Sequence, residues 1–409
     1  MKLSDSFDLI IRNALVFDKN EIMDIAIKDD KIALVEKKIK SASKEEFDAV
    51  ERLTSPGFID AHMHLDHAFI GEDAMCVHRT LAEAAEISVE KSKAITPDNF
   101  KRNAKKAAKL ALRKGTTALR TNVSLNQITG ITPLKAILEL KEECSTWMDI
   151  QVVAFMTEFP FTSSEAGESL LRQAMSLGAD VVGGLPWLDL NPKKYLDIIF
   201  NVARDFEADI DLHVDESNNP KDLTLGIYAE KALKEGYQGR VTAGHCCSLS
   251  AVSDEVAKGV TEKVLGAKMN IVANPFDNLY LWGEDERPEG VTRVGDLLDA
   301  GVNVIYATDS TRDVFDPLAN ADMLLAGLFL AYLTQLDGKD SLKTIFKMGT
   351  SGAAKATRII QNYGINPGGK ADLMILDAEN PREAIIEQAK RLYVVKNGKI
   401  VVKNGNLTF

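Results

Sequence analysis

Eight short apolar runs, most of them separated by helical patterns, constrain the fold of this chain more than any other feature. The runs lie at 57–64, 116–123, 149–156, 179–185, 209–215, 240–245, 269–275 and 303–309. Buried strands that alternate with helices over roughly 300 residues are typical of a (β/α)8 barrel. A doubly wound open sheet is the alternative, but neither a G-x-G-x-x-G nor a G-x-x-x-x-G-K-[ST] motif supports nucleotide binding there. We therefore expect an α/β protein with a TIM barrel.

The two ends of the chain have a different texture, with short alternating strands and tight turns. The C-terminal part contains two hairpin turn signals, Asn397-Gly398 and Asn404-Gly405. Chain termini often lie close together, so the two ends can pack as one module. We expect residues 1–55 and 360–409 to form a composite β-sandwich domain, and residues 56–359 to form the barrel.

The composition is that of a folded protein, with 45% hydrophobic and 27% charged residues. Basic residues number 49 against 60 acidic ones, and phosphate binding needs a positive surface, so we expect no nucleic-acid partner. The four cysteines form no C-x-x-C pair, which argues against a disulfide framework. The chain has no apolar run of about 18 residues and no secretory signal pattern. We therefore expect a cytoplasmic protein with no membrane partner.

Histidine is scarce, so the positions of its few copies are informative. The six are His62, His64, His67, His78, His213 and His245, of which His78 is expected to be a structural or loop residue. His62 and His64 lie two apart near the end of the first run, and the period of a strand points both side chains the same way. His213 lies near the end of the fifth run, His245 ends the sixth and Asp309 ends the eighth. Because the carboxyl ends of barrel strands meet at one mouth, we expect these groups to converge.

Imidazole and carboxylate groups of this kind are ligands for a divalent metal ion. We predict one ion, Zn²⁺ or Fe²⁺ with Mn²⁺ also accepted, held by His62, His64, His213 and Asp309. Such an ion makes a bound water nucleophilic at neutral pH. His245 is then left to hydrogen-bond the attacking oxygen. Glu216, three residues after His213, is the candidate that moves a proton from water to the substrate.

Four motifs surround these residues, namely PGFIDAHMHLD (56–66), HVDE (213–216), TAGH (242–245) and ATDS (307–310). Together with DLIIRNA near the start and GINPGGKADLMILD (364–377) near the end, they make the chain resemble the amidohydrolase superfamily, in its cytosine deaminase-like branch. The resemblance covers nearly the whole chain. It implies a distorted TIM barrel, a β-sandwich built from both termini, and a metal-dependent hydrolase of non-peptide carbon–nitrogen bonds, in cyclic amidines.

The chain is similar also to N-isopropylammelide isopropylaminohydrolases, for example in FDLIIRNA and in the tail 384–400. HVDE follows the cytosine deaminases instead, because those aminohydrolases have histidine and aspartate where this chain has Asp215 and Glu216. They also have a lysine at the position of His67. The resemblance thus implies an aminohydrolase, but it does not identify the heterocycle.

The expected substrate contacts come mostly from positions where the chain departs from one or both relatives. The relatives grip the ring with a glutamine after the third strand, where this chain has Thr157 and Glu158. Cytosine deaminases have a second acid where this chain has Ser310, and Phe315 is expected to cover the ring. His67 and Asn122 complete the predicted set. The fourth run has no lysine at its end to bridge two metals, so we expect a mononuclear site.

The favoured function is hydrolysis of an exocyclic C–N bond of a small nitrogen heterocycle, cytosine deaminase-like or aminotriazine-like. In this scheme Glu216, His245 and Asp309 are catalytic. Two alternatives remain: hydrolysis of a cyclic or linear amide on the same scaffold, and a non-catalytic barrel that acts as a binding protein. We expect a small-molecule heterocycle as the partner and a homo-oligomer as the assembly.

Overall fold

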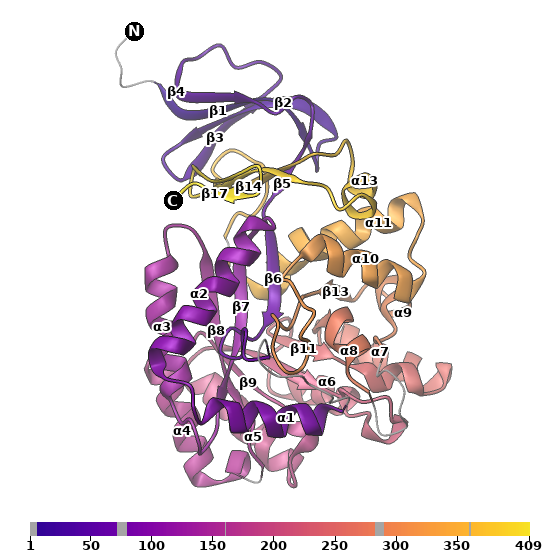
Figure 1. Cartoon of the computed structure of the whole chain (residues 1–409). Helices are drawn as coiled ribbons and strands as arrows, with labels where there is room; N and C mark the ends of the chain where they lie inside the picture. Colours follow the sequence, from indigo (N-terminus) through magenta and orange to yellow (C-terminus); the bar gives the residue numbers. More distant parts are fainter. Residues whose placement is uncertain (1–5, 72–79, 160, 283–289, 360) are drawn as a thin grey trace.

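The computed structural model describes residues 6–71, 80–159, 161–282, 290–359 and 361–409 (Figure 1). Cys76 and His78 lie outside the described residues. Two sheets organise the chain, one of eight strands and one of nine. Among the described residues, no helix has the length and apolar character needed to cross a membrane.

Each of the eight predicted apolar runs forms a strand of one parallel sheet, in which sequence neighbours are spatial neighbours. The strands are β6 (Phe58–Met63), β7 (Thr116–Leu125), β8 (Asp149–Met156), β9 (Val181–Gly184), β10 (Asp209–Val214), β11 (Val241–His245), β12 (Asn270–Ala273) and β13 (Asn303–Tyr306). Almost every residue in these strands is buried, as expected for parallel strands covered on both faces. The prediction of an α/β TIM barrel is confirmed.

The barrel closes between β6 and β13 through a short, irregular contact. Met63 and Asp309 form an isolated parallel bridge. The backbone N–H of His64 donates to the carbonyl of Asp309, and the N–H of Asp309 donates to the carbonyl of His62, both at 3.0 Å. The first and last strands are thus joined at the residues that carry the predicted site.

Helices follow most barrel strands and pack around them. They are α1 (Leu81–Ser92), α2 (Pro97–Arg113), α3 (Thr132–Cys144), α4 (Glu165–Ser176), α5 (Pro192–Asp205), α6 (Leu225–Lys234), α7 (Asp254–Gly266), α8 (Pro275–Tyr280), α9 (Val294–Asp299), α10 (Met323–Thr334), α11 (Lys339–Lys347) and α12 (Ala353–Thr357); a further helix, α13 (Pro381–Ile386), lies in the C-terminal segment. Helix α2 shows the local logic: Thr96 caps its start, Pro97 is its first residue, and an alanine-rich face is buried. Its lysines form ion pairs with the acids of α3, such as Lys101 with Glu143.

The two ends of the chain meet in the second sheet, where β5 pairs antiparallel with β14. Its strands are β1 (Phe7–Val16), β2 (Glu21–Lys28), β3 (Lys31–Glu36), β4 (Ser43–Asp48), β5 (Leu53–Pro56), β14 (Leu373–Leu376), β15 (Arg391–Lys396), β16 (Lys399–Lys403) and β17 (Asn406–Leu407). Asn397 and Gly398 turn between β15 and β16 with φ of 49° and 75°, as the hairpin signal predicts. We propose residues 1–55 and 360–409 as the bounds of this module.

The terminal module is anchored to the barrel by a buried lysine. Lys396 has no exposed side-chain surface, and its ammonium donates to Asp149 of β8 and Asp372, both at 2.6 Å. The module lies at one end of the barrel, and α1 lies across the opposite end (Figure 1). The mouth at the carboxyl ends of the strands is therefore free of the module.

Candidate metal centre and active site

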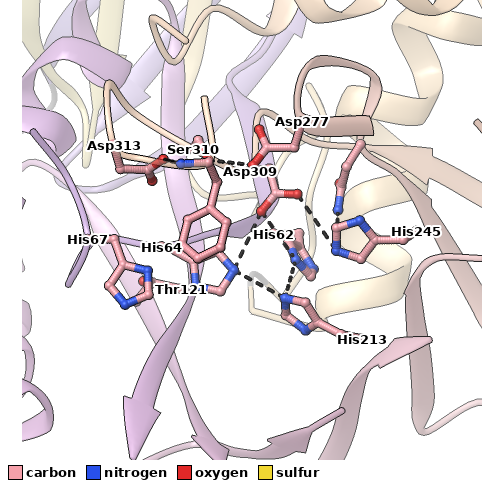
Figure 2. Close-up of polar contacts among 12 residues, drawn as sticks. His62, His64, His67, Thr121, His213, His245, Asp277, Asp309, Ser310 and Asp313 are labelled. Atoms are coloured by element: carbon pink, nitrogen blue, oxygen red, sulfur yellow. Dashed lines mark hydrogen bonds and ion pairs between the residues drawn. The ribbon is translucent and has the colours of Figure 1, made fainter. Parts of the chain in front are cut away.

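Three imidazole rings meet at the mouth of the barrel (Figure 2). His62 lies in β6, His64 directly follows that strand, and His213 lies in β10. The Nε2 atom of His213 lies 3.2 Å from that of His62 and 3.1 Å from that of His64. Gly244 on β11 makes room for the ring of His62, because a Cβ at position 244 would lie only 2.8 Å from the Cε1 atom of His62. The prediction that His62 and His64 point to the same side, because they lie two residues apart, is consistent with this geometry.

The Asp309 carboxylate completes the cluster at the end of the last strand. Its Oδ1 atom lies 3.6 Å from Nε2 of His62 and 3.5 Å from Nε2 of His64. Ligands about 2.0–2.1 Å from a tetrahedral Zn²⁺ ion lie about 3.3–3.4 Å apart. The four separations given above, 3.1–3.6 Å, bracket that spacing. His62, His64 and Asp309 lie at ligand spacing for a metal ion, and His213 does so in a second group with His62 and His245.

The electrostatics of the cluster favour a cation as well. Burial lowers the pKa of His62, His64 and His213 well below the ordinary histidine value, so the three rings are neutral. Neutral imidazole is the form that binds metals. Burial and the nearby Glu216 raise the pKa of Asp309 well above its usual range, which a bound cation would reverse. Phe155 stacks on His213 with ring centroids 4.2 Å apart and holds its plane.

His245 lies beside the cluster with both ring nitrogens engaged by protein groups. Its Nδ1 atom lies 3.2 Å from Oε1 of Glu216 and 3.2 Å from Nδ2 of Asn278. Its Nε2 atom lies 3.3 Å from Nδ2 of Asn274 and 3.7 Å from Oδ2 of Asp309. Burial lowers the pKa of His245 to about 3, so the ring is neutral at working pH. The contacts of both ring nitrogens suit the predicted hydrogen-bonding role, although His245 also lies at ligand spacing from His62 and His213.

The strand ends that carry these groups have strained backbones. His245 and Asp309 adopt left-handed conformations with φ of 65° and 61°. Such conformations are costly for residues other than glycine and persist where surrounding structure enforces them, often at functional sites. Asp215 shares this feature with φ of 50°, but its carboxylate accepts from the N–H groups of Thr224 and Leu225 at the start of α6. Asp215 is thus a structural cap beside Glu216.

A pocket opens from the cluster toward α1. Four of the six predicted substrate contacts line it, namely His67, Thr157, Ser310 and Phe315. The lining also includes His64, His213, Glu216, His245 and Asp309. His67 stacks between His64 and Phe315, with ring centroids 5.5 and 5.7 Å away. Its Nε2 atom lies 3.2 Å from Oγ of Ser124. These positions place an aromatic wall beside the metal ligands.

The other two predicted contacts are not among the lining residues. The Glu158 carboxylate accepts from the side-chain and backbone N–H groups of Gln127, at 2.8 and 2.5 Å, and so fixes a neighbouring loop. Asn122 is fully buried in β7, with no hydrogen-bond partner for its amide among the described residues. A role for either in substrate binding stays a prediction.

Several residues of the site were absent from the sequence prediction. Asn274 and Asp277 follow β12, the seventh barrel strand, and the rule that strand ends carry site residues could have found them. Helix α1 could not be found in that way. It places Leu81, Ala85 and Val89 on one face, and that face forms an apolar side of the pocket.

The amidohydrolase family matches residues 71–402 of the chain. N-isopropylammelide isopropyl amidohydrolase from Pseudomonas sp. (strain ADP) is 36% identical over 98% of this chain and 99% of its own length. The solved structure of 5-methylcytosine deaminase from Klebsiella pneumoniae covers 96% of this chain and 98% of its own, with a TM-score of 0.89 and 28% identity. The solved structure of N-isopropylammelide isopropylaminohydrolase from Burkholderia multivorans covers 98% of this chain and 99% of its own, with a TM-score of 0.85 and 25% identity. The chain belongs to the amidohydrolase family and is a hydrolase.

Proposed function

We propose that this protein is a metal-dependent aminohydrolase that cleaves an exocyclic C–N bond of a small nitrogen heterocycle and releases ammonia or an amine. The observation that carries the proposal is the contact of Glu216 with His245 beside the cluster of three imidazoles and Asp309. Two of the named relatives support it, since one is an isopropyl amidohydrolase of N-isopropylammelide and the other a deaminase of 5-methylcytosine.

In this proposal His62, His64, His213 and Asp309 hold one divalent ion, Zn²⁺ or Fe²⁺ with Mn²⁺ also accepted. The ion supplies Lewis-acid activation of a water molecule when it is bound. His245 hydrogen-bonds the oxygen that adds to the ring carbon, which orients it and stabilises developing charge. Oδ2 of Asp309 has no hydrogen-bond partner among the described residues, which leaves it able to accept a proton from the attacking water.

Glu216 moves the proton that deamination requires. Its carboxyl group lines the pocket and is buried, so a proton held there is shielded from solvent. It receives one proton from the attacking water and donates it to the ring nitrogen next to the reacting carbon. The second proton of that water, which Asp309 accepts from the added hydroxyl, then passes through Glu216 to the leaving amine. Thr157, Ser310 and Phe315 stand where they can contact the ring from other sides.

The test combines metal analysis with a screen for ammonia or amine release over aminopyrimidines, amino-s-triazines and related heterocycles. We expect about one equivalent of metal per chain, loss of activity with a chelator, and recovery when Zn²⁺, Fe²⁺ or Mn²⁺ is returned. Ring opening without amine release would instead support amide hydrolysis. A protein that retains no metal and turns over no heterocycle would contradict both. The expected homo-oligomer and cytoplasmic location stay predictions, to be tested by light scattering and cell fractionation.

A further inference from the structure

One acid in the pocket has no role in the chemistry described above. Asp277 belongs to the short helix α8 after β12, and only 3% of its surface is exposed. Its Oδ2 atom accepts a hydrogen bond from the hydroxyl of Ser310 at 2.5 Å (Figure 2). Both residues line the pocket beside Asp309. The hydroxyl therefore fixes the orientation of a carboxylate that faces the substrate space.

The second oxygen of this carboxylate is left without a partner. Oδ1 of Asp277 is buried and has no hydrogen-bond partner among the described residues. Asp313, by contrast, is not a lining residue, and its Oδ1 accepts from the backbone N–H groups of Phe315 and Asp316 as the anchor of a turn. A buried acceptor without a partner is unfavourable, so a ligand that donates a hydrogen bond to Asp277 gains affinity.

The charge of the pocket restricts which ligands can make that bond. Its described lining includes four carboxyl groups, those of Asp66, Glu216, Asp277 and Asp309, and no lysine or arginine. One divalent ion offsets part of this charge at the ligand end. A phosphate or carboxylate on the substrate would meet acidic groups and no lysine or arginine among the described lining residues, so it would gain no ion pair with them. An amino or ring N–H group would be attracted.

We propose that Asp277, held in place by Ser310, is a specificity-determining residue that accepts a hydrogen bond from a second N–H group of the substrate. The preferred substrates are then neutral or cationic heterocycles with an amino or ring N–H group besides the reacting amine, and without phosphate or carboxylate groups. This inference rests on the proposed function, because it names the substrate class of the same pocket.

The test is a binding measurement on metal-depleted protein, in which no turnover occurs. Two probes that differ by one amino group, 2,4-diaminopyrimidine and 4-aminopyrimidine, are titrated by calorimetry in an alkaline buffer in which both are uncharged. We expect wild type to bind the diamino probe at least tenfold more tightly. Asp277→Ala should reduce that preference to threefold or less. The exposed variant Glu230→Gln should keep the wild-type preference.

A second variant keeps the result interpretable if the first folds poorly. Asp277→Asn has the same shape and keeps one of the two acceptor oxygens, so the preference should fall to between threefold and tenfold while the melting temperature stays within a few degrees. Equal binding of the two probes by wild type, or an undiminished preference in Asp277→Ala, would overturn the inference. A clear preference in binding without amine release from any heterocycle would instead contradict the proposed function alone.

Discussion

The carboxylate of Asp60 in β6 is hydrogen-bonded to both the hydroxyl and the backbone N–H of Thr308, which follows β13, at 2.5 and 3.2 Å. These two bonds join the first barrel strand to the end of the last. Asp60 lies two residues before His62 and Thr308 directly precedes Asp309, so this contact adds to the backbone bonds that close the barrel beside two of the predicted ligands. Burial raises the pKa of Asp60 to about 6, which shows how strongly its carboxylate depends on these donors.

Loss of the Thr308 hydroxyl should destabilise the fold. In Thr308→Val the buried carboxylate of Asp60 keeps the backbone donor and loses the side-chain donor, and an unsatisfied buried acceptor costs about 1–3 kcal/mol. Urea denaturation measures this change. Thr117→Val is the matched control, because the Thr117 hydroxyl is buried without a partner among the described residues and its removal should be neutral or stabilising. Equal destabilisation by both variants would contradict the assigned role.

A methyl group at position 244 should damage the metal centre. In Gly244→Ala the new Cβ would lie 2.8 Å from Cε1 of His62, so the ring must move away from the other ligands. We expect metal affinity to fall about 10- to 100-fold, as it does when the surroundings of a ligand are altered. Metal content after dialysis against a chelator series measures it. Gly259→Ala, with open space around the new Cβ, should retain wild-type metal affinity.

The proton-shuttle assignment predicts a defect in turnover without loss of metal. Glu216→Gln keeps the size of the side chain and removes its ability to carry a proton, so kcat should fall about 10²- to 10⁴-fold. Metal content should be unchanged, since Glu216 is not among the proposed ligands. The control Glu230→Gln changes an acid that pairs with Lys263 on the surface. Full turnover by Glu216→Gln on the best substrate would refute the assignment.

Acidification should destabilise the protein through its buried histidines. The folded-state pKa of His245 is about 3, below the unfolded value of 6.5, so the unfolded state binds more protons as the pH falls. The stability that neutral His245 contributes is therefore fully present above pH 6.5, and it is lost progressively as the pH falls toward 3. Between pH 7 and pH 5, His245 alone should account for about 2 kcal/mol. Urea denaturation of metal-depleted wild type and His245→Asn at both pH values measures this contribution. An equal change in the free energy of unfolding between pH 7 and pH 5 in the two proteins would contradict it.

Helix α1 should limit the size of ligand that the pocket accepts. Val89→Trp adds bulk on the pocket-lining face, so KM should rise at least tenfold while metal content is retained. Ala82 lies on the exposed side of the same helix, and Ala82→Trp should leave KM unchanged. If both variants behaved like wild type, the face of α1 would not form part of the functional pocket.

The barrel could be predicted because its signal is local and repeated. Each strand is a short apolar run, and a turn such as Asn397-Gly398 needs only its own residues to adopt positive φ. The placement of His62, His64, His213 and Asp309 followed from one rule, since parallel barrel strands end at the same mouth. Periodicity and topology therefore carried the ligand prediction.

The remaining features depend on which distant side chains come into contact, and no local pattern encodes that. Glu158 directly follows the lining residue Thr157, yet Gln127 from another loop takes up its carboxylate. Asp277 lines the pocket with its carboxyl group hydrogen-bonded to the hydroxyl of Ser310, 33 residues later. Burial, which displaces the pKa of His245 so far, is likewise a property of the packed barrel. The sequence by itself determined the strands and the residue types at their ends, whereas the tertiary structure decided hydrogen-bond partners and solvent exposure, because both are set by groups far apart along the chain.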